Sequence, residues 1–166
     1  MDISSTIQLI VLVILLALSA FFSSSETALT TVNRIRMRSL AEEGNKRAAR
    51  VLQVTDDSAK MLSAILIGNN VVNLTASSLA TALALRIFGN AGAGIATGIL
   101  TVMILIFGEI SPKTMATLRA EKISLRFCNI IWLLMKALTP VIFIINHLAM
   151  LVLRLMGVKA SEADRP

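Results

Sequence analysis

The chain has 166 residues, of which 55% are hydrophobic and 16% charged, and its formal net charge at pH 7 is +6. Together with a mean hydropathy of +0.78, this composition excludes an ordinary soluble domain and indicates a membrane protein. One cysteine, Cys128, excludes an intrachain disulfide, and one histidine, His147, excludes a metal site built from several histidines.

Three apolar segments are each long enough to cross a bilayer as a helix, which takes about 20 residues. They run from about 7 to 30, from about 61 to 88 and from about 93 to 110. The first has Asp2 and no lysine or arginine ahead of it, so we interpret it as a retained helix rather than a signal peptide. The sequence therefore predicts an all-α membrane protein with three transmembrane helices.

The segment 33–57, between the first two spans, is rich in arginine and lysine. The positive-inside rule places this loop in the cytoplasm, which puts the N-terminus and the glycine-rich turn at 89–94 outside. We expect one or two short basic helices in the loop and a helix start at Asp56-Asp57-Ser58. The basic side chains either contact anionic lipid headgroups or form a solvated face that fixes the topology.

The last apolar stretch, about 120–157, is interrupted by Pro140. A single span across 141–153 would leave Arg154 and Lys159 outside, which the positive-inside rule disfavours. We therefore prefer two shorter juxtamembrane helices, broken near Pro140, that lie along or dip into the cytoplasmic face. A fourth span is the alternative.

Polar side chains recur inside the spans. The first span carries a set on one helical face, and the second carries a set in one narrow arc: Ser19, Ser23, Glu26, Thr27 and Thr30, then Asn70, Asn73 and Ser77. Each set alone has a structural explanation, because hydroxyls bond back to their own helix and asparagines bridge helices. Ala76, Ala80 and Ala84, and Gly94 and Gly98, repeat every four residues, which favours close helix packing within the chain or in a dimer.

Glu109 lies at the inner end of the third span. A carboxylate at the centre of a membrane helix costs about 2.5 kcal/mol or more, so a partner is expected, and a cation is the usual one. Pro112 lacks an N–H and clashes with the carbonyl of Gly108, so we expect the helix to break there and free that oxygen. The alternative is a helix that ends at the interface with Glu109 solvated. An all-oxygen set of ligands suits Mg²⁺, Ca²⁺, Mn²⁺ or Na⁺.

Three stretches carry a family resemblance: Phe22–Leu29 (FSSSETAL), Ile67–Asn73 (IGNNVVN) and Phe107–Lys113 (FGEISPK). They resemble, in the same order, the signature stretches of the transmembrane domain of the CorC/CNNM (cyclin M) magnesium transporters. The resemblance implies a homodimer with three spans per subunit and a juxtamembrane helix belt. It also implies Mg²⁺ export coupled to Na⁺ entry. The cation ligands that it implies are Ser23, Asn70, Gly108 and Glu109, with a second tier of Ser24, Glu26, Asn69, Asn73, Ser111 and Pro112.

We therefore expect a multi-pass magnesium transporter of the cell (inner) membrane that works by alternating access, with its C-terminus in the cytoplasm. Membrane lipid and a second copy are the expected partners, and nucleic acid is not. The alternative is a dimeric adaptor or magnesium sensor that transports nothing. We do not expect an enzyme, because an intramembrane protease would need paired aspartates or a Ser/His pair in the spans. Residues 1–157 should form the transmembrane domain. Residues 158–166 should begin a linker to the cytoplasmic nucleotide-binding domains that family members usually carry, which are absent from this sequence.

Overall fold

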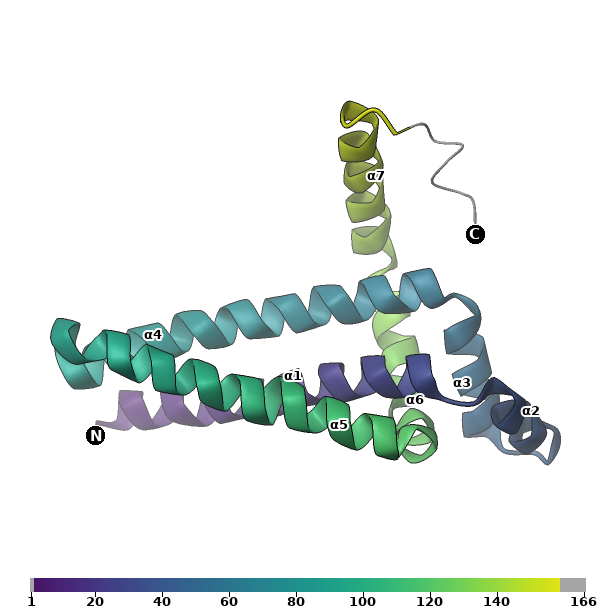
Figure 1. Ribbon diagram of the computed structural model, residues 1–166, viewed down its shortest axis with the longest axis horizontal. Coiled ribbons are helices and arrows are strands. Elements are labelled where there is room, and N and C mark those ends of the chain that lie inside the picture. The colour runs from purple at the N-terminus through teal and green to yellow at the C-terminus, as the bar shows by residue number, and fades with distance from the viewer. Residues whose placement is uncertain (1, 159–166) are drawn as a thin grey trace.

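The computed structural model describes residues 2–158, and every regular element in that range is a helix (Figure 1). In chain order these are α1 (Ile3–Thr31), α2 (Arg34–Glu42), α3 (Lys46–Asp56), α4 (Ser58–Ile104), the π-helix η1 (Leu105–Ile110), α5 (Ser111–Leu118), α6 (Ala120–Ala137) and α7 (Thr139–Leu155). The prediction of an all-α protein is confirmed.

The chain reverses direction within α4, at Gly89. This residue has φ 68° and ψ −172°, a region of backbone space that is essentially restricted to glycine. The reversal divides the segment into a first arm, residues 58–88, and a second arm, residues 90–118, which runs back through η1 and α5 (Figure 1). The predicted glycine-rich turn at 89–94 is therefore much tighter than expected, because the helix resumes at Asn90.

The bundle is formed by α1 and the two arms, which lie side by side along its length (Figure 1). The N-terminus lies at the end where the arms reverse, and there Arg86 donates a hydrogen bond to Ser4 Oγ at 2.8 Å. We call this the Gly89 end. Because α1 runs away from the Gly89 end and the first arm runs toward it, these two helices are antiparallel.

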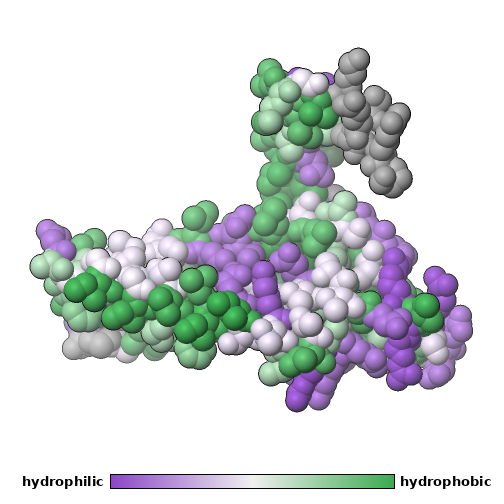
Figure 2. All heavy atoms as spheres, viewed as in Figure 1, coloured by the Kyte–Doolittle hydropathy of each residue, from purple (hydrophilic) through white to green (hydrophobic). Residues whose placement is uncertain are grey.

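Two stretches, Ile3–Thr31 and Ser58–Leu118, are long and apolar enough to cross a membrane, and the second contains the reversal at Gly89. The bent pair α6–α7 is a third candidate. Apolar side chains such as Ile95 and Phe107 are exposed on the outside of the bundle, and Figure 2 shows hydrophobic residues over the second arm and α7. Such a surface is suited to lipid rather than to water. The predicted spans 7–30, 61–88 and 93–110 all fall inside these helices, which extend a few residues beyond them.

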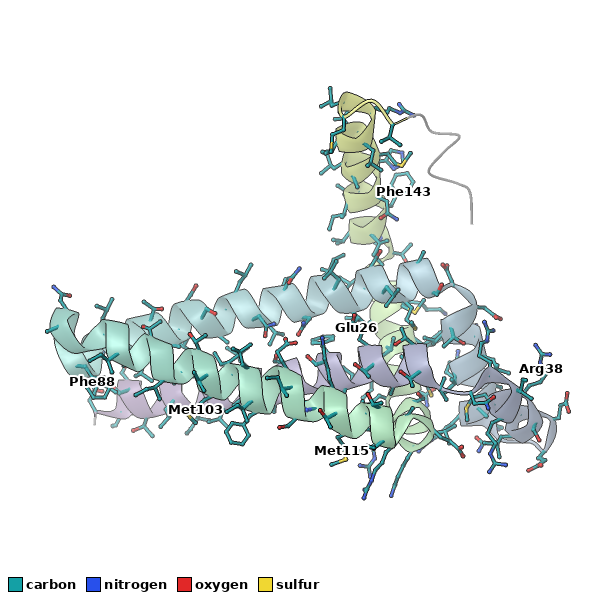
Figure 3. The ribbon with its side chains drawn as sticks, viewed as in Figure 1. Glu26, Arg38, Phe88, Met103, Met115 and Phe143 are labelled. Atoms are coloured by element: carbon teal, nitrogen blue, oxygen red, sulfur yellow. The ribbon has the colours of Figure 1, made fainter. Side chains whose placement is uncertain are left out.

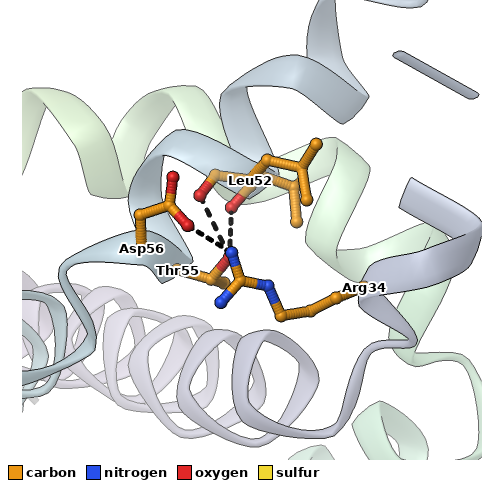
Figure 4. A network of polar contacts seen from close by, with 5 residues as sticks. Arg34, Leu52, Thr55 and Asp56 are labelled. Carbon is orange, nitrogen blue, oxygen red and sulfur yellow. Dashed lines mark hydrogen bonds and ion pairs between the residues drawn. The ribbon is translucent and has the colours of Figure 1, made fainter. Parts of the chain in front are cut away.

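The opposite end is closed by α2 and α3, whose charged residues form the hydrophilic end of the molecule in Figure 2. Asn33, Asn45 and Asp57 cap α2, α3 and α4 respectively, each accepting a backbone N–H of the first turn. Arg34 of α2 forms an ion pair with Asp56 of α3 (Figure 4). The predictions of short basic helices and of a helix start at Asp57 are confirmed.

Beneath α2 and α3 lies the main apolar core. Its fully buried side chains come from helices that are distant in sequence: Met37, Val51, Val54, Met61, Ile65 and Ile131. Cys128 of α6 is also fully buried, and its Sγ lies 3.6 Å from the carbonyl oxygen of Arg47 on α3. This core holds α3, α4 and α6 together at the end opposite Gly89.

The polypeptide bends by 66° between α6 and α7. The bend follows from Pro140, which occupies the first turn of α7, where its missing N–H is tolerated. The prediction of two helices broken near Pro140 is confirmed. Helix α7 projects away from the bundle (Figure 1), and Ile142 is its one buried residue in the described chain. Lys159 and almost all of the predicted linker 158–166 lie outside the described residues.

The small residues of the first arm pack within the chain. Ala76 and Ala80 are buried against Leu12 of α1, so the alanine repeat lets α1 and the first arm approach closely. By contrast, Gly94 and Gly98 of the second arm are exposed, and a Cβ added at either one would meet nothing within 4 Å.

Candidate cation site

A chain of polar side chains connects α1, the first arm and the second arm inside the bundle. Ser19 Oγ donates to Asn73 Oδ1 at 2.7 Å, and Asn73 Nδ2 donates to Glu109 Oε1 at 3.2 Å. On the other side of the carboxylate, Lys113 Nζ lies 3.6 Å from Glu109 Oε2. The three segments thus contribute one hydroxyl, one amide and one carboxylate to a single connected network.

Glycine permits the close approach on which this network depends. Gly108 is buried on η1, and a Cβ added there would lie 3.1 Å from Ser19 Oγ and 3.3 Å from Leu16 Cδ1. Gly68 on the first arm is covered by the ring of Phe22, whose Cζ would lie 2.6 Å from an added Cβ. The two motif glycines therefore bring both arms against α1 at the level of the polar side chains.

The helix does not break between Gly108 and Pro112, so that prediction is wrong. Residues 105–110 form a π-helix, and the N–H of Ser111 bonds the carbonyl of Ile106, five residues back. Ile110 and Ser111 both keep helical φ and ψ. The wider π turn absorbs the disturbance, and Pro112 then occupies the first turn of α5, where no N–H is needed. Such π-bulges occur frequently at functional sites.

Two buried oxygens next to this network have no hydrogen-bond partner among the described residues. They are Ser23 Oγ and Asn69 Oδ1. Ser23 is one turn after Ser19 on α1, and Asn69 is one turn before Asn73 on the first arm. Because these helices are antiparallel, both oxygens are displaced in the same direction from the Ser19–Asn73 pair. A buried polar group without a partner is unfavourable by about 1–3 kcal/mol, so both oxygens are suited to a bound cation or its water shell.

The structure brings some of the expected ligands together and leaves others apart. Asn73, a second-tier residue, is the asparagine that contacts Glu109, whereas Asn70 is exposed. Ser24 Oγ donates to the carbonyl of Phe21 in its own helix. Glu26 lies on α1 nearer the α2 end (Figure 3), outside the hydrogen-bonded chain, and Ser111 is exposed.

Sequence reasoning missed two participants in this network. Ser19 was on the polar face but not among the expected ligands, and only its distance to Asn73 singles it out. Lys113, the last residue of the third motif, was not among the expected site residues either, but it forms an ion pair with the carboxylate of Glu109. The signal was present, since Glu and Lys four residues apart face each other on a helix. The carboxylate of Glu109 therefore already has the ammonium of a lysine in the same chain as a partner.

The possible cation ligands that the described residues place at this site are all oxygen atoms, and Glu109 is the one carboxylate among them. No group of three or more His, Cys, Asp and Glu side chains comes together within the described range. One carboxylate with hydroxyl and amide oxygens suits a hard cation that keeps part of its water, such as Mg²⁺ or Na⁺. It does not suit zinc or copper, which favour nitrogen and sulfur ligands.

Toward the Gly89 end, the network borders a cavity of about 90 Å³. Ser19 and Asn73 are its only polar lining residues, and the others include Leu12 of α1 and Leu100 and Met103 of the second arm. Figure 3 shows Met103 on this arm. The polar site is therefore separated from the Gly89 end by an apolar layer, which disfavours passage of a hydrated ion in this conformation.

Comparison with known proteins supports the resemblance carried by the three motifs. The family model of the cyclin M transmembrane N-terminal domain matches residues 10–166. A UPF0053 protein of Haemophilus influenzae is 43% identical over 150 residues, which are 90% of this chain and 36% of that protein. The UPF0053 inner membrane protein YfjD of Escherichia coli is 40% identical over 144 residues, which are 87% of this chain and 34% of that protein.

A more distant relative has a functional name. The polyamine export protein of Escherichia coli is 26% identical over 170 residues, covering 95% of this chain and 38% of that protein. The chain thus spans little more than a third of the length of these curated relatives. The match over residues 10–166 shows that this chain belongs to the cyclin M transmembrane N-terminal domain family.

Proposed function

We propose that this chain is the membrane domain of a transporter that exports Mg²⁺ from the cytoplasm in exchange for Na⁺. In this proposal α1 and the two arms are the three membrane spans of the transporter. Two copies of the chain form a homodimer in the inner membrane. The α2–α3 end faces the cytoplasm and the Gly89 end faces outside, because the basic loop of α2 and α3 obeys the positive-inside rule.

The hydrogen-bonded chain Ser19–Asn73–Glu109 is the observation that carries this proposal. It places the partly buried carboxylate of Glu109 beside the amide of Asn73, which in turn accepts from Ser19, while the ammonium of Lys113 lies on the other side of the carboxylate. Ser23 and Asn69 add two buried oxygens that have no partner in the described chain. A charged side chain in a membrane span is a candidate for an ion pathway, and oxygen ligands suit magnesium and sodium.

We propose that the π-helix is a moving part of this transporter. Its turn contains Gly108 and Glu109, so a change between π and α geometry would rotate the carboxylate relative to Asn73. In the proposed orientation the apolar layer around Leu12 and Leu100 lies between the site and the outside, and we propose that the inward-open and outward-open states differ at this layer. Alternating access needs two arrangements of this kind.

Polyamine export is a second candidate, favoured by the name of the Escherichia coli relative. A polyamine is also a hard cation, but it is long and distributes its charges along an aliphatic chain. The ammonium of Lys113 lies 3.6 Å from Glu109 Oε2, which supports an alkylammonium group as a partner for this carboxylate. A third possibility is a dimeric adaptor or magnesium sensor, which would bind the cation without moving it.

Flux measurements in sealed proteoliposomes test the proposal. Mg²⁺ and Na⁺ gradients are varied independently, and spermidine is supplied in a separate series. We expect Mg²⁺ flux that depends on the Na⁺ gradient and is lost in Glu109→Gln. It should persist in Glu43→Gln, which neutralises an exposed carboxylate on the surface of the molecule.

Each alternative has its own signature in this experiment. Spermidine flux without Mg²⁺ flux would replace magnesium by polyamine as the substrate. Saturable Mg²⁺ binding with no flux under any gradient would favour the sensor. Equal Mg²⁺ flux in wild type and Glu109→Gln would refute the site.

A further inference from the structure

A second cavity, of about 440 Å³, lies outside the polar network, between α1, α5 and α6. Apart from Ser24, the residues that line it are basic or apolar. The basic ones are Arg119, Lys122 and Arg126, and the apolar ones include Ala17, Ala20, Phe21, Met115 and Phe127. We propose that this cavity binds one anionic phospholipid, with the phosphate held by the basic residues and an acyl chain lying on the apolar floor.

The charge around the cavity selects an anion. Arg119 immediately precedes α6, and Lys122 and Arg126 follow one and two turns into that helix, on the same side. None of the three forms an ion pair with a described residue. The nearest acidic residue of α6, Glu121, pairs with Arg36 of α2 at 3.5 Å instead. The cavity lining therefore contains three positive charges and no carboxylate, which also makes it an unfavourable entry route for Mg²⁺ or a polyamine.

The apolar part of the cavity selects a lipid over a soluble phosphate. Its floor is built from the membrane-facing part of α1, and the rings of Phe21 and Phe127 meet edge to face at 4.8 Å between centroids. Met115 on α5, labelled in Figure 3, closes another side. A free phosphate would make no favourable contact with these apolar surfaces. An acyl chain would pack on them, and the bound phosphate would hold that chain in the cavity in preference to other lipids of the bilayer.

The order of the two parts along the bundle matches the orientation of a bilayer lipid. Ala17 and Ala20 lie toward the middle of α1, and the basic residues lie beyond the end of the second arm at Leu118. A lipid in this cavity would therefore have its tail toward the membrane centre and its phosphate at the membrane surface. Basic pockets between membrane helices are known recognition sites for anionic headgroups.

Occupancy would link α6 to the transport helices. The lipid phosphate would contact α6, and the tail would contact α1 and the first turns of α5, which follow directly on the π-helix. Because Pro112 lines the same cavity, a bound lipid would brace the segment that carries Glu109 without touching the carboxylate.

Native mass spectrometry of the chain in a neutral detergent tests this proposal. The protein is titrated with phosphatidylglycerol, and with phosphatidylcholine as the zwitterionic control. We expect one tightly retained phosphatidylglycerol. The triple variant R119Q/K122Q/R126Q should bind it about a hundredfold more weakly, as expected for the loss of three basic contacts to an anionic lipid.

Two control variants make the result specific. R38Q/K46Q/R47Q removes the same charge from exposed positions on α2 and α3 and should retain the lipid with less than about a threefold change, because these residues do not line the cavity. Ala20→Leu fills the floor without changing charge and should weaken retention by about tenfold. Circular dichroism and thermal unfolding show whether each variant is folded.

Three outcomes would overturn the proposal. Equal weakening in both triple variants would mean general electrostatic attraction rather than a site. Competition by glycerol 3-phosphate at the concentration that phosphatidylglycerol needs would mean a soluble phosphate site. Equal retention of phosphatidylcholine would mean that the basic residues do not select the ligand.

Discussion

Asn73 donates a hydrogen bond to Glu109 at 3.2 Å, across 36 positions of sequence and between the two antiparallel arms. The same amide accepts from Ser19 of α1 at 2.7 Å. Asn73 is thus the residue through which all three bundle segments share one polar network. Removing it would leave a serine hydroxyl and a carboxylate without their mutual bridge.

Asn73→Ala should reduce Mg²⁺ affinity by at least about tenfold and lower the thermal midpoint by several degrees, because the buried hydroxyl of Ser19 and the partly buried carboxylate of Glu109 each lose a hydrogen-bond partner, at a cost of about 1–3 kcal/mol. Asn70→Ala is the matched control, since Asn70 is exposed and only three residues away. Calorimetric Mg²⁺ titration with thermal unfolding checks both. Loss of binding in Asn70→Ala with normal binding in Asn73→Ala would assign the ligand role to the exposed asparagine instead.

Lys113→Met should increase the affinity for Mg²⁺ by about threefold to tenfold. The ammonium of Lys113 lies 3.6 Å from Glu109, so it competes with a metal cation for the negative charge of this carboxylate. The gain is modest because the lysine side chain is 47% exposed and screened by solvent. Titration of wild type, Lys113→Met and the exposed control Lys46→Met measures it. Unchanged or weaker binding in Lys113→Met would show that the ammonium does not compete with the ion.

Gly108→Ala should destabilise the bundle by about 1–3 kcal/mol and weaken cation binding, because the new Cβ would press on Ser19 Oγ at 3.1 Å. Gly98→Ala on the same arm meets nothing within 4 Å and should be neutral or slightly stabilising. Thermal unfolding in detergent compares the two. Equal thermal midpoints for Gly108→Ala and Gly98→Ala would mean that α1 and η1 can move apart without loss of stability.

Gly89→Ala should destabilise the hairpin of the two arms by about 1–3 kcal/mol. Space is not the reason, since an added Cβ would meet nothing within 4 Å, but φ is +68°. Gly94→Ala, a helical position in the same apolar region with equal space, is the control. A Gly89→Ala protein as stable as wild type would indicate that the reversal can be made at a neighbouring residue.

Cysteine labelling from each side of the membrane tests the proposed orientation. In a Cys128→Ala background, Asn90→Cys should react with an impermeant external reagent, whereas Arg38→Cys and Met156→Cys should react only after permeabilisation. All three positions are exposed, so access rather than burial decides the result. External labelling at Met156 would mean that α7 crosses the membrane. External labelling at Arg38 would invert the whole topology.

The sequence by itself determined the class of the protein and most of its helices. Apolar length and the turn and capping residues Gly89, Asp57 and Pro140 are local signals, because each acts on backbone that is only a few residues away. For the same reason the short helices of the basic loop and the break before α7 were predictable. The three motifs, which are contiguous in sequence, indicated the family that the comparison shows.

Only the tertiary structure decided which polar residues meet. Helical periodicity places Asn69, Asn70 and Asn73 near one another on one helix, but it does not give the rotation of that helix against α1. Packing around Gly68 and Gly108 sets this rotation, and it directs Asn73 to Glu109 while leaving Asn70 exposed. The π-helix was equally inaccessible to local reasoning. Proline predicts that an α-helical bond is lost, but the surrounding helices decide whether the chain breaks or, as here, widens by one residue and continues.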